Sequence, residues 1–273
     1  MGIEENKEKE YFARNLELEA DRERLSLQER TFDSFTIRHL ETIGVSSGWR
    51  CLNVGAGYGS ITDWLARKVG DTGRVVATDL RPELHREAVS PVEVRKHDIL
   101  NDEIEQDYYD LVCARMLLQH LPQPESGLKR MSTAVKPGGW ILIEELDNLA
   151  IPSSDSNDPQ ADFFYRSIHK YLGLLKEAGG RAEFGRNVRY FLEQIGYDDI
   201  ANEGHTFLVR GGEPWATALI TSAMLVWKRL IDTELVIEEE IRETADEIER
   251  LLSNPSFQFV STPLFSAWGR KPK

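Results

Sequence analysis

The chain has 273 residues, of which 41% are hydrophobic and 29% are charged, and its formal net charge at pH 7 is −13. This balance is typical of a folded globular protein, and the negative charge argues against a general binder of nucleic acid or of an acidic membrane surface. No apolar stretch is long enough to span a membrane and the N-terminus is no signal peptide, so we expect a cytoplasmic protein without a membrane partner.

The N-terminal part of the chain is rich in Glu, Arg and Lys, with apolar residues interspersed. Residues 4–34 are predicted to form one or two amphipathic helices, and residues 36–44 continue as a helix that ends at Gly44. We assign residues 1–48 to an N-terminal helical lid and residues 49–273 to one domain.

A glycine-rich turn follows this helical part. Residues 50–54 form a short apolar run that predicts a strand, and residues 60–69 carry apolar residues at helical spacing. Between them stand Gly55, Gly57 and Gly59. Glycine permits a tight turn and a close approach of a ligand to the main chain, so the turn is a candidate binding loop, although glycine turns are common.

The next strand strengthens this interpretation. Residues 74–79 read as a second buried strand that ends in Asp79, about 20 residues past the glycines, where a carboxylate that accepts ribose hydroxyls is expected. The dinucleotide pattern G-x-G-x-x-G requires a glycine at position 60, where Ser60 stands. A nicotinamide cofactor is therefore disfavoured.

Strands and helices alternate along the rest of the chain. Further strands are expected at residues 92–98, 109–114, 140–145, 206–209 and 264–269, and helices after Pro82 and at 123–135, 162–178, 185–195, 215–231 and 237–252. Such alternation predicts a parallel sheet whose ligands bind at the carboxyl ends of the strands. Helical insertions are expected at about 147–184 and 213–253, and the aromatic residues of the first suggest a lid over an apolar pocket.

The two cysteines, Cys51 and Cys113, each fall in an expected core strand. Buried free thiols are the ordinary state of such residues, and a disulfide framework or a metal site is not expected from them. We predict no bound metal.

From Trp49 to Glu145 the order of these motifs resembles that of the class I S-adenosylmethionine (SAM)-dependent methyltransferases. The Pro-Gly-Gly turn at residues 137–139 is a further similarity. The resemblance implies an α/β, Rossmann-like fold with a seven-stranded, mostly parallel sheet, an antiparallel last strand, helices on both faces and helical lid insertions. One departure is Asn53, which stands where the family usually has Asp or Glu, so a reduced affinity for SAM is left open.

The resemblance also implies which residues bind SAM. In that family the glycine turn wraps the methionine part, an acid after the second strand binds the ribose, and an acid after the third strand meets the adenine. The corresponding residues are Gly55, Ala56 and Gly57 for methionine, Asp79 and Leu80 for the ribose, and Asp98 and Ile99 for the adenine. Further candidates are Arg115, Met116, Gln119 and, on the N-terminal helix, Tyr11. A turn or capping role for the acids, and a packing role for Tyr11, are the alternatives.

Methyl transfer from SAM requires a positioned acceptor and, for hydroxyl or carbon acceptors, removal of a proton. His120, just after the fourth strand, and His169, on the aromatic helix, are candidate bases, although lone histidines more often have structural roles. Glu144 and Glu145, at the end of the fifth strand, are further candidates. The candidate acceptor-binding residues are Phe164, Tyr165 and His169.

The sequence therefore predicts a SAM-dependent methyltransferase that acts on a small, largely apolar organic acceptor. The whole pattern resembles enzymes of the ubiquinone or natural-product type, which names no acceptor, and O-, N- and C-methylation stay open. Two alternatives are a SAM-binding enzyme that does not methylate, such as a cyclase, and a non-catalytic SAM-binding module. A homodimer is also left open.

Overall fold

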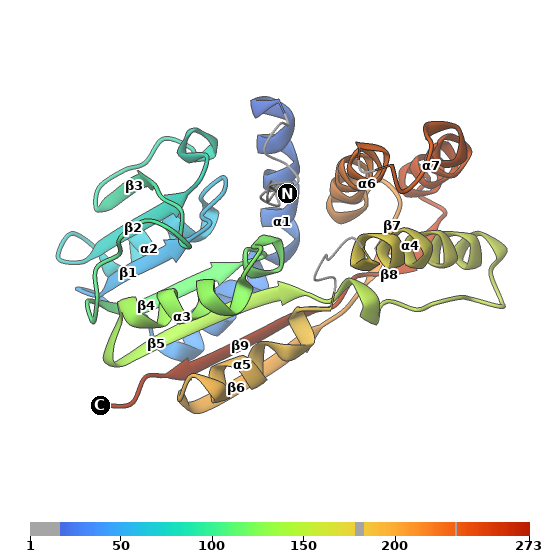
Figure 1. Cartoon of the computed structure of the whole chain (residues 1–273). Helices are drawn as coiled ribbons and strands as arrows, with labels where there is room; N and C mark the ends of the chain where they lie inside the picture. The colour runs from blue at the N-terminus through green and yellow to red at the C-terminus, as the bar shows by residue number, and fades with distance from the viewer. Residues whose placement is uncertain (1–16, 178–182, 233) are drawn as a thin grey trace, which may run out of the picture.

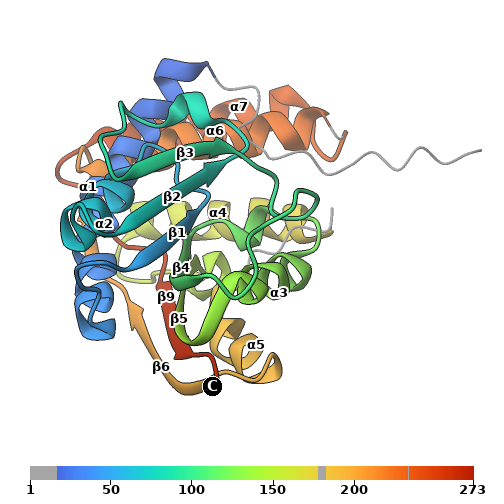
Figure 2. The ribbon, with the colours of Figure 1, turned by 90° about the vertical axis from the view of Figure 1, so that its left-hand side faces the viewer.

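The computed structural model describes residues 17–177, 183–232 and 234–273, so the candidate Tyr11 lies outside the described residues. Seven strands form one sheet in the order β3-β2-β1-β4-β5-β9-β6, and Figure 2 shows them fanned out with a steady twist. They are β1 (Arg50–Val54), β2 (Arg74–Asp79), β3 (Val92–Lys96), β4 (Tyr109–Arg115), β5 (Val135–Leu146), β6 (Asp198–His205) and β9 (Leu264–Arg270). Strand β9 runs antiparallel to the other six strands of this sheet, which are parallel to one another, and this confirms the predicted fold class.

Successive residues of the central strands point to opposite faces of the sheet, and both faces are buried. Cys51 packs with one pair of helices, whereas its neighbour Leu52 packs with another pair. The first pair is α1 (Leu18–Ile43) and α2 (Ser60–Val69), and the second pair is α3 (Pro124–Ala134) and α5 (Val188–Gln194). Both cysteines are buried and free, as expected.

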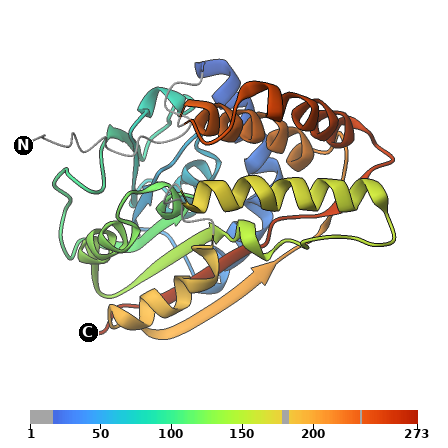
Figure 3. The ribbon, with the colours of Figure 1, turned by 45° about the vertical axis from the view of Figure 1, so that its right-hand side comes forward.

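Three further helices form a separate layer with its own apolar core (Figures 1 and 3). Helix α1 lies between this layer and the strands β1, β2 and β3. The three helices of the layer are α4 (Pro159–Glu177), α6 (Pro214–Asp232) and α7 (Glu238–Ser253), and the two-stranded sheet of β7 (Leu208–Arg210) and β8 (Gln258–Val260) joins them. Phe32 of α1 meets Trp215 of α6 edge to face, with ring centroids 4.8 Å apart. None of the described helices is long and apolar enough to cross a membrane.

The prediction of a helix after Pro82 was wrong, because only one turn of 3-10 helix, η1 (Pro82–Leu84), forms there. The chain becomes extended at His85, whose buried ring packs on the main chain of Gly59. A Cβ atom at Gly59 would lie 2.4 Å from Nε2 of His85, so the glycine makes this packing possible.

The expected strand at residues 206–209 overlaps β7, but β7 pairs with β8 in the small sheet, so its assignment as the sixth strand of the main sheet was wrong. The sheet strand is β6, which precedes it, while Phe207 and Val209 pack into the core of the helical layer. The polar sequence of β6 fits its place at the edge of the sheet, where it pairs only with β9. In addition, β5 begins at Val135 rather than Trp140, and its pairing with β4 jumps over the Pro-Gly-Gly segment.

Candidate active site

A cavity of about 370 Å³ lies at the carboxyl ends of β1, β2, β3, β4 and β5, with the helical layer as its other wall. Every expected cofactor residue within the described chain lines this cavity. These residues are Gly55, Ala56, Gly57, Asp79, Leu80, Asp98, Ile99, Arg115, Met116 and Gln119. The topology thus brings together residues from four strand ends that are far apart in the sequence.

The glycine turn has a backbone that only glycine adopts easily. The φ angles of Gly55, Gly57 and Gly59 are +69°, +56° and +106°, in the region that L side chains avoid. The N–H groups of Gly55 and Ala56 donate to the carbonyl oxygen of Thr78 at 2.8 and 3.0 Å, which fixes the turn against β2. A Cβ at Gly55 would lie 3.0 Å from Leu117, so the bare backbone lets the Leu117 side chain pack closely on the turn.

Asp79 stands at the end of β2 with its carboxylate held by backbone donors. The N–H of Gly57 donates to Oδ2 at 3.0 Å, and the N–H of Arg81 donates to Oδ1 at 2.9 Å. Burial raises the pKa of Asp79, and these two hydrogen bonds oppose that shift. The carboxylate is therefore oriented at the cavity wall and keeps lone pairs that could accept hydroxyl groups.

Asp98 is held in the same manner after β3. Its Oδ1 accepts the N–H of Leu100 at 2.9 Å, and its Oδ2 accepts Nδ2 of Asn101 at 2.8 Å. The side chain thus closes a turn and lines the cavity at once.

Asn53 lies behind the glycine turn, where the resemblance leads one to expect an acid. Its Nδ2 donates to Oγ1 of Thr62 at 3.0 Å, and its Oδ1 lies 3.6 Å from Sγ of Cys113. The amide thereby connects β1, α2 and β4 without placing a charge in a site that is only 6% exposed. Asn53 thus supports the turn from within the fold and is also part of the cavity lining.

Helix α1 supplies site residues that the sequence did not single out. Oε1 of Glu29 accepts the N–H of Ser60 at the start of α2, at 2.8 Å. Oδ1 of Asp33 accepts both Oγ of Ser60 and NH2 of Arg115, each at 2.9 Å. The residues of α1 that line the cavity include Arg24, Leu25, Gln28 and Glu29. The amphipathic pattern predicted the helix but did not indicate which polar residues would face the glycine turn.

A buried ion-pair group fastens the first turns of α1 to the loop after β2. Asp21 is fully buried, and its Oδ1 accepts Nε and NH2 of Arg24 at 2.9 and 2.6 Å. Its Oδ2 accepts NH1 of Arg81 at 3.1 Å. This contact sets α1 beside Asp79, so the helix borders the cavity along one side.

The two acids at the end of β5 are both buried and fully engaged. Glu145 accepts the N–H groups of Leu117, Leu118 and Gln119 at 3.0, 2.7 and 3.3 Å, and it therefore holds the loop after β4. Burial raises the pKa of Glu145 to about 8, against the opposing effect of these donors.

Glu144 accepts Oγ1 of Thr36, Oγ of Ser266 and Nδ1 of His39 at 2.5, 2.9 and 2.8 Å. Burial raises the pKa of Glu144, but the hydrogen bond from His39 and the charge of Arg115 outweigh it, so the pKa lies below its usual value. A carboxylate with these partners orients α1, and Glu144 also lines the cavity.

The two histidines proposed as bases fall in different places. His120 lines the cavity from the short helix η2 (Leu118–His120), with its Nε2 3.3 Å from Nε2 of Gln119. His169 does not reach the described cavity wall, since its Nε2 lies 3.1 and 3.2 Å from the carbonyl oxygens of Ile151 and Pro152.

Helix geometry explains which residues of α4 face the cavity. Phe164, Ile168, Tyr171 and Leu172 share one face of α4 and line the cavity. Tyr165 is rotated by about 100° from Phe164, because an α-helix has 3.6 residues per turn. Its hydroxyl accepts the N–H of Val260 at 2.8 Å, and it is not among the described lining residues.

The half of the cavity opposite the glycine turn is mainly apolar. It is formed by α4, α6, α7 and β8, and its wall includes Phe164, Tyr171, Trp215, Ala223, Trp227 and Phe259. The sequence predicted an aromatic lid from α4 but named neither tryptophan of α6. The result is one continuous cavity with a glycine-rich, acidic part and an apolar, aromatic part.

Comparison with protein families shows which family this chain belongs to. The family model described as "Methyltransferase domain" matches residues 8–209, which is most of the chain. The chain belongs to this family. The resemblance to class I SAM-dependent methyltransferases is therefore confirmed, together with SAM as their cofactor.

Curated relatives agree with this assignment to the methyltransferase-domain family. The chain is 26% identical over 172 residues to methyltransferase str2 of Strobilurus tenacellus, an alignment that covers 62% of this chain and 61% of the relative. It is 28% identical over 155 residues to a ubiquinone/menaquinone biosynthesis C-methyltransferase of Chromobacterium violaceum, covering 54% and 60%. The matched part of the chain thus spans about three fifths of the length of these relatives.

Among solved structures, the methyltransferase-domain chain is similar to phosphoethanolamine N-methyltransferase 2 of Haemonchus contortus, which was crystallised with S-adenosylhomocysteine. The TM-score is 0.52 at 16% identity, and the match covers 88% of this chain and 53% of that one. At this identity the similarity shows the shared fold alone.

Proposed function

We propose that this chain transfers a methyl group from SAM to a small, largely apolar organic acceptor. The observation that carries the proposal is the continuous cavity that joins the glycine turn to the aromatic wall of α4 and α6. Such a cavity can hold a polar cofactor and an apolar acceptor side by side.

The residues of the polar part suit SAM. The positive φ angles of the turn let the methionine part approach the main chain, and the held carboxylate of Asp79 is placed to accept ribose hydroxyls. Asp98 and Ile99 would border the adenine, as the family pattern implies. When bound, SAM supplies an activated methyl group on a positively charged sulfur.

The apolar part supports an acceptor with a flat or hydrophobic body. Trp215, Trp227 and Phe164 offer ring faces and edges, and burial of apolar surface against them would bind the acceptor. One curated relative is a C-methyltransferase of ubiquinone and menaquinone biosynthesis, which supports including phenols and quinols among the acceptors to be tried.

His120 is the residue that we propose as general base. It lines the cavity, and an imidazole has an ordinary pKa close to neutral pH. In the reaction the acceptor forms a bond to the methyl carbon, the bond from that carbon to sulfur breaks, and the acceptor's proton passes to the imidazole. Glu144 binds His39 of α1, Glu145 holds the loop after β4, and His169 lies off the described cavity wall.

The helical parts would act as a lid. We propose that the segment up to residue 48 closes one side of the cavity through α1, and that the insertions at about 147–184 and 213–253 close the apolar side. We also propose, from the sequence, a cytoplasmic location and no binding of nucleic acid, and a homodimer stays open. The net charge of −13 supports the absence of nucleic-acid binding.

The test is a calorimetric titration of the full chain with S-adenosylhomocysteine, beside a parallel titration with NAD. We expect binding of the first and none of the second. A screen with SAM and a panel of phenols, quinols and apolar amines, read by mass spectrometry, then identifies the acceptor. Failure to bind S-adenosylhomocysteine would contradict the proposal, conversion of an acceptor with the methyl retained on SAM would indicate a cyclase-like enzyme, and binding without any turnover would indicate a binding module.

A further inference from the structure

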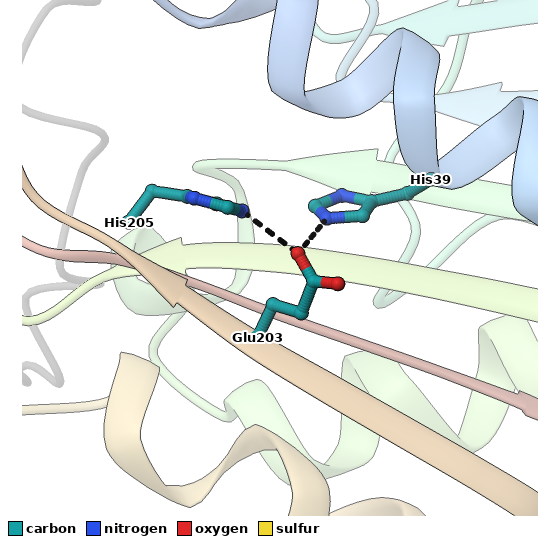
Figure 4. A group of neighbouring side chains, drawn as sticks. All are labelled: His39, Glu203 and His205. Atoms are coloured by element: carbon teal, nitrogen blue, oxygen red, sulfur yellow. Dashed lines mark hydrogen bonds and ion pairs between the residues drawn. The ribbon is translucent and has the colours of Figure 1, made fainter.

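Away from the cavity, side chains of α1 and β6 converge in a group that could hold a metal ion (Figure 4). Its members are His39, Glu203 and His205, and one ligand atom from each lies within 4.8 Å of the others. Oε2 of Glu203 lies 3.3 Å from Nε2 of His39 and 3.2 Å from Nε2 of His205. Both imidazoles thus approach the same carboxylate oxygen.

Packing holds the two imidazole rings in place. His39 is 1% exposed and stacks on Trp268, with ring centroids 4.8 Å apart. His205 stacks on Phe35 with centroids 4.4 Å apart. Glu203 and His205 are two residues apart on β6, so their side chains leave the strand on the same face. The two imidazole rings are therefore held in place before any ion arrives, which favours binding.

The hydrogen-bond partners make Nε2 the unprotonated nitrogen of each ring. Nδ1 of His39 lies 2.8 Å from Oε1 of Glu144, and a carboxylate oxygen accepts, so in the neutral ring this nitrogen carries the proton. A carboxylate behind a histidine in this manner is typical of metal-binding imidazoles. Nε2 of His205 lies 2.9 Å from NH2 of Arg38, which can only donate, so this nitrogen is an acceptor.

The two contacts to Glu203 also have the spacing expected between neighbouring ligands of one metal ion. An imidazolium–carboxylate hydrogen bond is usually about 2.7–2.9 Å long, which is shorter than either contact to Glu203. Two ligands at about 2.0–2.1 Å from a tetrahedral Zn²⁺ lie roughly 3.3 Å apart, which agrees with both contacts. Two histidines and one carboxylate are also a known ligand set for zinc.

Arg38 places a positive charge beside Glu203 and His205. Its NH2 group lies 2.5 Å from Oε2 of Glu203 in addition to its contact with His205. The Arg38 side chain is 50% exposed, so it can turn into solvent and make room for a cation. A cation and Arg38 would thus compete for the same lone pairs.

We propose that His39, Glu203 and His205 form a binding site for a divalent transition-metal ion of the Zn²⁺ class that fastens α1 to the edge of the sheet. A solvent molecule would complete the coordination on the exposed side of Glu203. Because α1 also carries Arg24 and Gln28 to the cavity wall, the ion would stabilise one side of the proposed active site. Sequence reasoning predicted no metal, since the ligands come from two segments far apart in the chain.

The experiment uses the full chain after treatment with a chelator and its removal. Titration with Co²⁺ reports binding through the visible absorption of the ion, and titration with Zn²⁺ is followed by calorimetry and by the shift in thermal unfolding. We expect one ion per chain and a higher unfolding temperature. The variants His205→Ala and Glu203→Gln should weaken binding about tenfold or more, whereas His169→Ala, which removes a histidine on α4, should leave binding unchanged.

Arg38→Ala separates the proposal from a simple ion-pair network. Removal of the competing guanidinium should tighten Zn²⁺ binding, although it removes an ion pair to Glu203. The proposal is overturned if the wild-type chain binds no ion, if His205→Ala binds as tightly as wild type, or if Arg38→Ala weakens binding. Circular dichroism of each variant shows whether the fold is kept, and the Arg38→Ala result stands even if a ligand variant fails to fold.

Discussion

Oδ2 of Asp79 accepts the backbone N–H of Gly57 at 3.0 Å, so the acid at the end of β2 holds the middle of the glycine turn. The same carboxylate accepts the N–H of Arg81 through its other oxygen. The two cofactor motifs found in the sequence are thus one hydrogen-bonded unit in the structure. Loss of the acid should affect both the shape of the turn and the ribose contact.

Asp79→Ala should weaken the binding of S-adenosylhomocysteine by about tenfold to a hundredfold, the usual cost of losing a hydrogen bond to a charged group. Asp79→Asn is the matched control, because it keeps one oxygen acceptor and should lose less affinity than the alanine variant. Isothermal titration calorimetry measures both affinities. Unchanged affinity in Asp79→Ala would remove Asp79 from the cofactor site.

His120→Ala tests the proposed base. If the imidazole removes the acceptor's proton, the rate of methyl transfer should fall by about 10²–10⁴-fold, while the affinity for S-adenosylhomocysteine changes little. Single-turnover kinetics with the acceptor found in the screen separates the two effects. Should turnover survive at the wild-type rate, the base lies elsewhere or none is needed.

Ala223→Phe tests the acceptor half of the cavity. Ala223 of α6 lines the apolar part, and a phenyl ring there would fill space that the acceptor needs. We expect an increased KM for the acceptor and an unchanged affinity for S-adenosylhomocysteine. Met224→Phe is the matched control, because Met224 is the next residue on α6 and is 58% exposed. Equal KM values for the two variants would contradict the assignment of the apolar half.

Glu145 should make stability depend on pH. Its pKa rises from 4.5 to about 8 on folding, so between these values the unfolded chain has lost a proton that the folded chain keeps. Glu145 therefore contributes its whole stabilisation below pH 4.5. This contribution to the free energy of unfolding is lost progressively as the pH rises to about 8. The slope is at most about 1.4 kcal/mol per pH unit.

Urea unfolding at several pH values between 5 and 8 measures this slope, with Glu145→Gln as the comparison. The amide keeps an oxygen to accept the N–H groups of Leu117 and Leu118 but does not titrate. The difference in unfolding free energy between the two proteins should change with pH, because titration of all other groups cancels. A constant difference would show that Glu145 keeps its ordinary pKa in the fold.

Local sequence pattern decided the central part of the fold. The run from Arg50 to Val69 contains a strand, a glycine turn and a helix whose boundaries follow from apolar spacing and from positions that require positive φ. The local pattern is sufficient to predict such elements, and Asp79 and Asp98 were then placed at the ends of the next two strands. The lining of the glycine-rich part of the cavity could therefore be predicted from the sequence.

The edge of the sheet and the side of the cavity formed by α1 were decided by tertiary structure alone. The strand β6 has a polar sequence with no strand pattern, and its pairing with β9 makes it a strand. The contacts of Glu29 and Asp33 with Ser60, and of His39 with Glu203, join residues that are remote in the sequence. Sequence periodicity shows which face of an element is apolar, but the partner of each polar side chain depends on where the folded chain brings distant segments together.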